Sequence, residues 1–252
     1  MKEIISIINQ KGGVGKTTTA HALGSGMAAK GNRVLFVDLD GQGNLSQTLN
    51  VENPKNSVLD VLLGKVSAKD AVSTIGTNAL LASSPLLATS DTVIVEVGKE
   101  FRLKEALHPL HDDYDYIILD TPPALGILTV NALAASTGVI IPAQADIYSL
   151  QGIDQLMGTV DIVKRYCNPD LVIKGILLTR YNSRTVLTRD ITEIIRYKAR
   201  ELGAKFYSSP IRESISIKEA QVGRMNIFQY APKSNATEDY EVFIKEVLED
   251  EL

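Results

Sequence analysis

A glycine-rich segment near the N-terminus combines residue types that bind phosphate. It follows an apolar run and precedes a predicted helix, and its glycines let backbone N–H groups turn inward around phosphate oxygens. The N-terminus of the helix adds partial positive charge. In a loop ending in Gly-Lys-Thr, Lys16 is expected to contact the β- and γ-phosphates, and the Thr17 hydroxyl is expected to bind Mg²⁺. The expected nucleotide-binding residues of this segment are Lys11, Gly12, Gly13, Val14, Gly15, Lys16, Thr17 and Thr18.

Three aspartates lie at or just beyond the ends of two predicted strands. Asp38 and Asp40 follow one apolar run, and Asp120 ends another. Such positions face the ligand crevice of an open α/β sheet, and residues two apart share one face of an extended segment. One carboxylate can order the Mg²⁺ shell while another positions the attacking water, so we expect Asp38 and Asp120 at the metal, through water. A single aspartate at a strand end could instead cap a helix, but three in this order after a phosphate loop disfavour that alternative.

The predicted elements that position these residues alternate between short strands and helices. Several strands are nearly continuous apolar runs, which is typical of strands buried on both faces of a parallel sheet. The alternation predicts an α/β fold with a doubly wound, mostly parallel sheet, helices on both faces, and a single domain over residues 1–252. The expected strands are Glu3–Ile8, Arg33–Asp38, Asp115–Asp120, Gly138–Pro142 and Val172–Thr179. The expected helices are Thr17–Lys30, Ser57–Leu63, Glu100–Leu110, Ile127–Ala135, Leu150–Tyr166, Val186–Leu202 and Thr237–Leu248.

Composition limits the kinds of protein that this chain can be. Among its 252 residues the single cysteine, Cys167, excludes an internal disulfide and any site built from several cysteines. No stretch approaches the roughly 20 apolar residues that cross a bilayer, and the N-terminal apolar run is too short for a secretory signal. We therefore expect a cytoplasmic protein.

The loop KGGVGKT, which begins at Lys11, resembles the deviant Walker A loop of the ParA/MinD class of P-loop ATPases. Residues 37–44, VDLDGQGN, resemble switch I of the ParA family, and residues 120–126, DTPPALG, resemble its switch II. The resemblance covers almost the whole chain and indicates the short ParA/Soj type, without an additional N-terminal helix-turn-helix domain. It implies that Lys11 crosses a dimer interface to the partner's nucleotide and that Asp40 is the catalytic aspartate, acting with Lys11 and Lys16. Gly41 stands where the family usually has proline.

Two segments towards the C-terminus resemble the parts of this family that lie near the adenine. Residues 178–185 follow the last predicted strand, and residues 209–214 contain the sequence Pro-Ile-Arg-Glu. The resemblance implies that Asn182, Pro210 and Arg212 belong to the ATP-binding site.

Charge is unevenly distributed along the chain, whose net charge is −4. Between Arg180 and Lys233 there are 11 Lys/Arg against 5 Asp/Glu. Such a segment favours an anionic partner, although solvated helix faces produce the same pattern. Contacts from these side chains to phosphate would be sensitive to salt and independent of sequence. The residues expected to bind DNA are Arg189, Arg196, Lys198, Arg200, Lys218 and Arg224.

Members of this ATPase class differ in what the dimer binds. An iron–sulfur protein of the nitrogenase iron-protein kind needs two cysteines per subunit, and this chain has one. A MinD-like membrane protein needs a basic amphipathic helix at the C-terminus, whereas residues 238–252 hold seven acidic residues and one lysine. A DNA partition ATPase agrees with the basic segment.

The sequence therefore predicts a partition ATPase with weak intrinsic activity that uses ATP and Mg²⁺. The resemblance implies an ATP-dependent homodimer, non-specific binding to DNA of the nucleoid, and a ParB-type centromere-binding partner that accelerates hydrolysis. No membrane partner is expected. Two alternatives remain: a ParA-like ATPase that positions a protein cargo, and a MinD-like membrane-associated ATPase.

Overall fold

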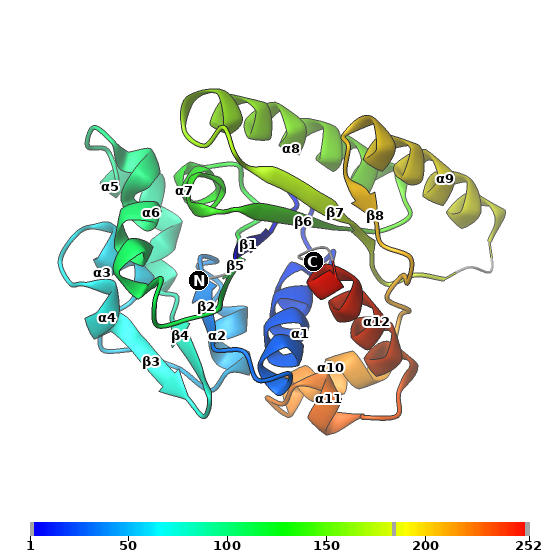
Figure 1. The fold of residues 1–252 in the computed structure, drawn as a ribbon, viewed down its shortest axis with the longest axis horizontal. Helices are drawn as coiled ribbons and strands as arrows, with labels where there is room; N and C mark the ends of the chain where they lie inside the picture. Colours follow the sequence, from blue (N-terminus) through cyan, green and yellow to red (C-terminus); the bar gives the residue numbers. More distant parts are fainter. Residues whose placement is uncertain (1–2, 183–184, 250–252) are drawn as a thin grey trace.

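A computed structural model describes residues 3–182 and 185–249, and within them eight strands form one sheet (Figure 1). Their order is β3-β4-β2-β5-β1-β6-β7-β8, and every neighbouring pair is parallel except β3 with β4. The prediction of a mostly parallel α/β sheet is thus confirmed. The strands are β1 (Glu3–Ile7), β2 (Val34–Asp38), β3 (Val72–Ile75), β4 (Asn78–Leu81), β5 (Tyr116–Asp120), β6 (Gly138–Ala143), β7 (Val172–Leu178) and β8 (Lys205–Phe206).

Helices cover both faces of the sheet, because alternate residues of the central strands face opposite cores. Ile5 and Ile7 of β1 pack with α1 and α12, whereas Ile4 packs with α3, α6 and α7 on the other face. The α helices of the described residues are α1 (Lys16–Ala29), α2 (Asn44–Thr48), α3 (Val58–Leu62), α4 (Ala68–Ala71), α5 (Ser90–Val93), α6 (Arg102–Leu107), α7 (Ile127–Ala135), α8 (Ile147–Tyr166), α9 (Val186–Glu201), α10 (Ile215–Val222), α11 (Ile227–Tyr230) and α12 (Asn235–Glu249). Short 3₁₀ turns are η1 (Pro85–Thr89), η2 (Lys99–Phe101) and η3 (His108–Leu110).

Helix α1, which follows the phosphate loop, lies unusually close to the sheet. At Gly24 a Cβ atom would come within 2.2 Å of the Phe36 ring on β2, so only glycine permits this approach. On another side of the helix, a Cβ at Gly26 would lie 2.3 Å from Ile244 of α12. The second half of α1 therefore packs closely against the Phe36 ring of β2 and the Ile244 side chain of α12.

The structure differs from the sequence prediction between residues 72 and 81. The sequence analysis predicts no strand there, whereas β3 and β4 form an antiparallel hairpin that extends the sheet beyond β2. Strand β3 is partly exposed and contains the polar residues Ser73 and Thr74, so it lacks the apolar run of a buried strand. Its turn is made at Gly76, which has a φ of 56°.

Two predicted helices have different bounds in the structure. The helix expected over residues 100–110 is reduced to α6 and flanked by the 3₁₀ turns η2 and η3, the second of which contains Pro109. Helix α8 begins at Ile147, three residues earlier than predicted, because the Asp146 side chain accepts a hydrogen bond from the Ser149 N–H and caps it. None of the described helices is long and apolar enough to span a membrane.

Candidate functional site

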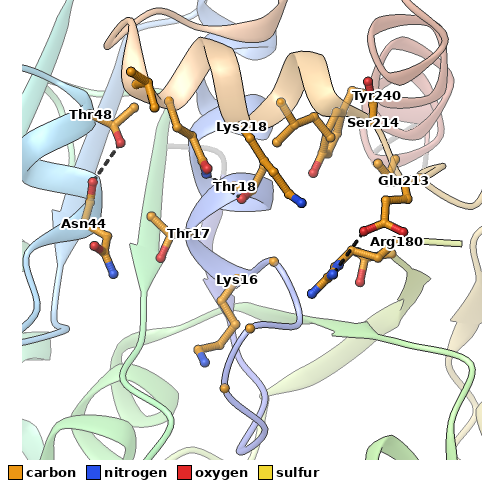
Figure 2. A pocket seen from close by; sticks show the side chains of 18 of the residues that line it. Lys16, Thr17, Thr18, Asn44, Thr48, Arg180, Glu213, Ser214, Lys218 and Tyr240 are labelled. Atoms are coloured by element: carbon orange, nitrogen blue, oxygen red, sulfur yellow. Dashed lines mark hydrogen bonds and ion pairs between the residues drawn. The ribbon is translucent and has the colours of Figure 1, made fainter.

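A cavity of about 760 Å³ lies around the N-terminus of α1, at the carboxyl ends of the central strands (Figure 2). Its walls come from the phosphate loop, the loop after β2, helix α2, the end of β7 and helix α10. Figure 2 shows the Lys218 side chain reaching down from α10 towards the start of α1, and the Lys16 side chain lying beside the phosphate loop; both residues line this cavity. Such a position at the carboxyl edge of an α/β sheet is where ligands of this fold class bind.

The phosphate loop has the backbone geometry that anion binding requires. Gly13 and Gly15 have φ values of 73° and 85°, in the left-handed region that favours glycine. No side chain in the described part of the chain caps α1, so the N–H groups of its first turn remain available to an anion. The Thr179 hydroxyl, just after β7, donates a hydrogen bond of 2.7 Å to the Val14 carbonyl and holds the loop against the sheet.

Lys16 is a buried cation at the centre of this site, with 7% of its surface exposed. Burial lowers the pKa of Lys16, while the nearby carboxylates of Asp120 and Asp40 act in the opposite direction. The ammonium group therefore lies close to Asp40 and Asp120, two of the three aspartates that the sequence predicts around the phosphates.

Asp120, the last residue of β5, is fully buried, and neither of its carboxylate oxygens has a hydrogen-bond partner among the described residues. Burial and the nearby Asp38 raise the pKa of Asp120 well above its ordinary value. Unpaired buried carboxylate oxygens are costly unless a cation or a water satisfies them. The hydroxyl of Thr17 belongs to the same site, and these oxygen donors suit a hydrated Mg²⁺.

Asp38 has a different environment from Asp120, although both end a strand. Its Oδ2 accepts hydrogen bonds from the Ser46 N–H and hydroxyl, at 2.8 and 2.7 Å, and its Oδ1 accepts one of 3.1 Å from the Asp40 N–H. Burial raises the pKa of Asp38 to about 6, against the effect of the Ser46 hydrogen bonds. Of the two aspartates expected at the metal, Asp120 has unpartnered oxygens, and Asp38 is engaged with the loop that follows β2. Asp40 itself lines the cavity.

Lys11 points to its own chain in this structure. Its ammonium group donates to Gln144 Oε1 at 3.2 Å and forms an ion pair with Asp146, the residue that caps α8. Gln144 also donates to the Gly13 carbonyl at 3.1 Å, so these contacts join the phosphate loop to the end of β6. Although burial works against it, the contacts with Lys11 and the Ser149 N–H hold the pKa of Asp146 below its ordinary value.

The residues expected near the adenine line a second cavity of about 630 Å³, which contains Asn182, Pro210 and Arg212. The Arg212 guanidinium is paired with the buried Asp239 of α12, with Nε and Nη2 donating at 2.9 and 2.6 Å. Arg212 lines both cavities, so the two form adjoining parts of one surface. Residues 183 and 184 of the same predicted segment lie outside the described part of the chain.

Comparisons with known proteins agree with this arrangement. A family described as an AAA domain matches residues 2–173. The chain is 40% identical over 252 residues to the sporulation initiation inhibitor protein Soj of Bacillus subtilis (strain 168), covering 98% of each chain. It is 37% identical over 250 residues to the chromosome partitioning protein ParA of Myxococcus xanthus (strain DK1622), covering 97% of this chain and 87% of that one.

The chain belongs to the ParA/Soj family. A crystal structure described as cobyrinic acid a,c-diamide synthase from Mycobacterium smegmatis, with a bound ATP analogue and magnesium, has the same fold. Its TM-score is 0.86 at 34% identity, over 98% of this chain and 95% of that one. A protein of this fold thus holds an ATP analogue and magnesium, which agrees with the expected ligands ATP and Mg²⁺.

The basic residues of this ParA/Soj chain fall into two groups. Arg196 lies over the Phe206 ring at 4.5 Å, Lys198 pairs with Asp154 at 2.7 Å, and Arg224 pairs with Glu52. Arg189, Arg200 and Lys218 are exposed and form no ion pair among the described residues. Lys218 and Arg224 also line the nucleotide cavity, whereas Arg189 and Arg200 lie on α9.

Several polar residues that hold the site together are absent from the sequence prediction. Gln144, Asp146 and Thr179 all follow the ends of β6 and β7, and Ser46 and Ser83 pack behind the loop after β2. A signal existed for the first three, because polar residues immediately after buried parallel strands face the ligand edge of the sheet. Ser83 follows the end of β4, a strand that is absent from the predicted elements, and Ser46 lies within α2, so neither is marked by a predicted strand end.

Proposed function

We propose that this member of the ParA/Soj family is a DNA partition ATPase whose ATP-bound dimer binds DNA without sequence preference and is released on hydrolysis. The observation that supports it most directly is the position of Lys16 at the N-terminus of α1, where it lines the cavity with Asp40 and lies close to the buried Asp120. The separate pair of exposed arginines on α9 supports the DNA-binding part of the proposal.

In this mechanism the β- and γ-phosphates of ATP lie over the N-terminus of α1, against Lys16. Thr17 holds Mg²⁺ with Asp120 and Asp38 through water, and the bound ion neutralises negative charge on the phosphate oxygens. Asp40 accepts a hydrogen bond from the attacking water and aligns it with the γ-phosphorus. The water oxygen bonds to phosphorus as the bond to the ADP oxygen breaks, which yields ADP and inorganic phosphate.

Dimer formation completes the site. Lys11 leaves Asp146 and Gln144 of its own chain and reaches the phosphates bound by the partner subunit. The isolated chain keeps this lysine in an ion pair, and intrinsic turnover is accordingly slow. A ParB-type centromere-binding protein accelerates hydrolysis and so releases the dimer from DNA.

DNA binding uses phosphate contacts from basic side chains outside the nucleotide cavity. Arg189 and Arg200 are separated by three turns on α9 and lie on one side of it, so both can meet a phosphate backbone. A dimer doubles the number of such contacts, and this makes DNA affinity dependent on ATP. In the cell this places the protein on the nucleoid, within the cytoplasm.

The test is a titration of DNA binding with salt in the presence of ATP, of ADP and of no nucleotide, using two unrelated DNA sequences of equal length. We expect DNA binding in the presence of ATP but not with ADP or without nucleotide, and equal affinity for both sequences. A plot of log affinity against log salt concentration should have a slope of about −0.9 for each phosphate neutralised. Hydrolysis is measured in the same samples with and without DNA and a ParB-type centromere-binding protein. Absence of DNA binding in every nucleotide state would contradict the proposal and favour the protein-cargo or membrane alternatives.

A further inference from the structure

Four residues behind the nucleotide cavity form a closed ring of hydrogen bonds through their side chains and backbone groups. The ring passes through Asp38, Asp40, Ser46 and Ser83, which come from the end of β2, the loop after it, helix α2 and the segment after β4. Only Asp40 of these four lines the cavity, and both serines are 95% buried. The serines therefore do not line the cavity themselves and can act on it only through the aspartates that they contact.

Each link of the ring has a donor and an acceptor. The Ser83 N–H donates to Ser46 Oγ at 3.0 Å, and that hydroxyl donates to Asp38 Oδ2 at 2.7 Å. Asp38 Oδ1 accepts the Asp40 N–H at 3.1 Å, and the Ser83 hydroxyl closes the ring by donating to the Asp40 carbonyl. A buried polar network in which every member is satisfied restrains the groups that it joins.

The ring holds the backbone of Asp40 on both sides of its Cα atom. The N–H is held by Asp38, and the carbonyl is held by Ser83 and by the Gly43 N–H at 2.8 Å. This restraint matters because the segment after Asp40 reads Gly-Gln-Gly and is conformationally free as a sequence. The Asp40 carboxylate accepts the Gln42 N–H of this same segment at 3.0 Å, so its position relative to a phosphate bound over α1 depends on the backbone that the ring holds.

We infer that Ser83, with Ser46, is a positioning residue for Asp40 in ATP hydrolysis. This inference rests on the proposed role of Asp40 in orienting the attacking water. In the sequence, Ser83 lies more than 40 residues after Asp40. It is brought to the site by the β3–β4 hairpin, whose second strand pairs with β2. That hairpin thus has a function in catalysis besides extending the sheet.

The decisive variant is Ser83→Ala, which removes a single hydrogen bond and leaves the Ser83 N–H on Ser46. The rate constant for hydrolysis of bound ATP should fall at least about tenfold, since a small misplacement of a catalytic group can cost about 100-fold. ATP affinity, measured with a fluorescent analogue, should stay within about twofold of the wild type, because no group that touches the phosphates has changed. Ser83→Thr keeps the hydroxyl and should restore most of the rate.

Ser84→Ala is the matched control, because within the described residues the neighbouring Ser84 hydroxyl bonds only the Leu86 N–H at the start of η1. It should hydrolyse ATP as the wild type does. If Ser83→Ala does not fold, Ser83→Cys preserves the side-chain volume with a weaker donor, and the same fall in rate is expected. Wild-type hydrolysis by Ser83→Ala or by Ser83→Cys would overturn the inference, as would an equal loss of rate and ATP affinity.

Failure of this inference can be separated from failure of the proposed function by adding Asp40→Ala. If Asp40 orients the water and Ser83 acts through it, Ser83→Ala should have no further effect on the residual rate of Asp40→Ala. Wild-type hydrolysis by Asp40→Ala would refute the role of Asp40 itself. An inactive Asp40→Ala beside a fully active Ser83→Ala would refute only the role of Ser83.

Discussion

The nucleotide cavity and the basic face of α9, formed by Arg189, Arg196, Lys198 and Arg200, are both predicted from the positions of charged residues. In the folded chain the charged residues of the two regions have different environments. Lys16 at the start of α1, Asp40 in the loop after β2 and Asp120 at the end of β5 come from three separate segments and meet at one edge of the sheet. On α9, Arg196 and Lys198 are held by neighbours of their own chain, while Arg189 and Arg200 remain exposed. Residues at strand ends are aligned by the sheet, whereas long side chains on a helix can pair with any acidic neighbour. Spacing is therefore a stronger guide to function at a strand end than on a helix surface.

The largest effect should come from the centre of the cavity. Lys16→Ala removes the buried cation that contacts the transferable phosphates, and turnover should fall about 1000-fold or more. The measurement is phosphate release by the purified variant at saturating ATP. Wild-type turnover would show that this cavity is not the catalytic site and would remove the contrast with α9.

The next effect separates catalysis from binding within the same cavity. Asp40→Ala should lower hydrolysis about 100-fold while ATP remains bound, because the carboxylate acts on water and the phosphate loop is unchanged. Chromatography with ATP should show the variant accumulating as a dimer. A monomeric variant that still hydrolyses ATP would contradict the assignment.

A smaller effect is expected at Lys11, on the rim of the cavity. Lys11→Ala should weaken ATP-dependent dimerisation about tenfold, as expected for one charge-assisted hydrogen bond, with little change in ATP binding by the monomer. Asp146→Asn is a useful companion, because it releases Lys11 from its ion pair and should not weaken the dimer. Loss of ATP affinity with intact dimers in Lys11→Ala would show that this lysine acts within its own subunit.

The smallest effect per residue should be on the basic face, and α9 supplies its own control. Changing the exposed pair, Arg189→Gln with Arg200→Gln, should reduce the salt slope of DNA binding by about 1 for each phosphate that is no longer neutralised. Changing the paired residues, Arg196→Gln with Lys198→Gln, removes the same charge from the same helix and should have a smaller effect. Equal effects of the two double variants would mean that net charge alone, and not exposure, determines DNA binding.

Much of the fold could be predicted from the sequence because its signals are local. The strand at Tyr116–Asp120 is four apolar residues followed by aspartate, and the helix at Ile127–Ala135 has the predicted bounds. The hairpin formed by β3 and β4 could not be predicted in this way, because β3 is short, half-exposed and polar at Ser73 and Thr74. Strand β3 is formed by pairing with β4, which in turn pairs with β2 of the central sheet.

Local sequence is enough to specify the phosphate loop, since glycines and a helix start define its backbone within ten residues. It also specifies which aspartates reach the ligand edge, because strand ends in a parallel sheet share that edge. What each charge contacts depends instead on the tertiary fold. Asp38 is engaged by Ser46, the Asp120 carboxylate accepts no hydrogen bond from the described residues, and Lys11 is held by Asp146, which lies 135 residues away. Such pairings depend on distances between segments remote in sequence, and these are set by the packing of the whole sheet.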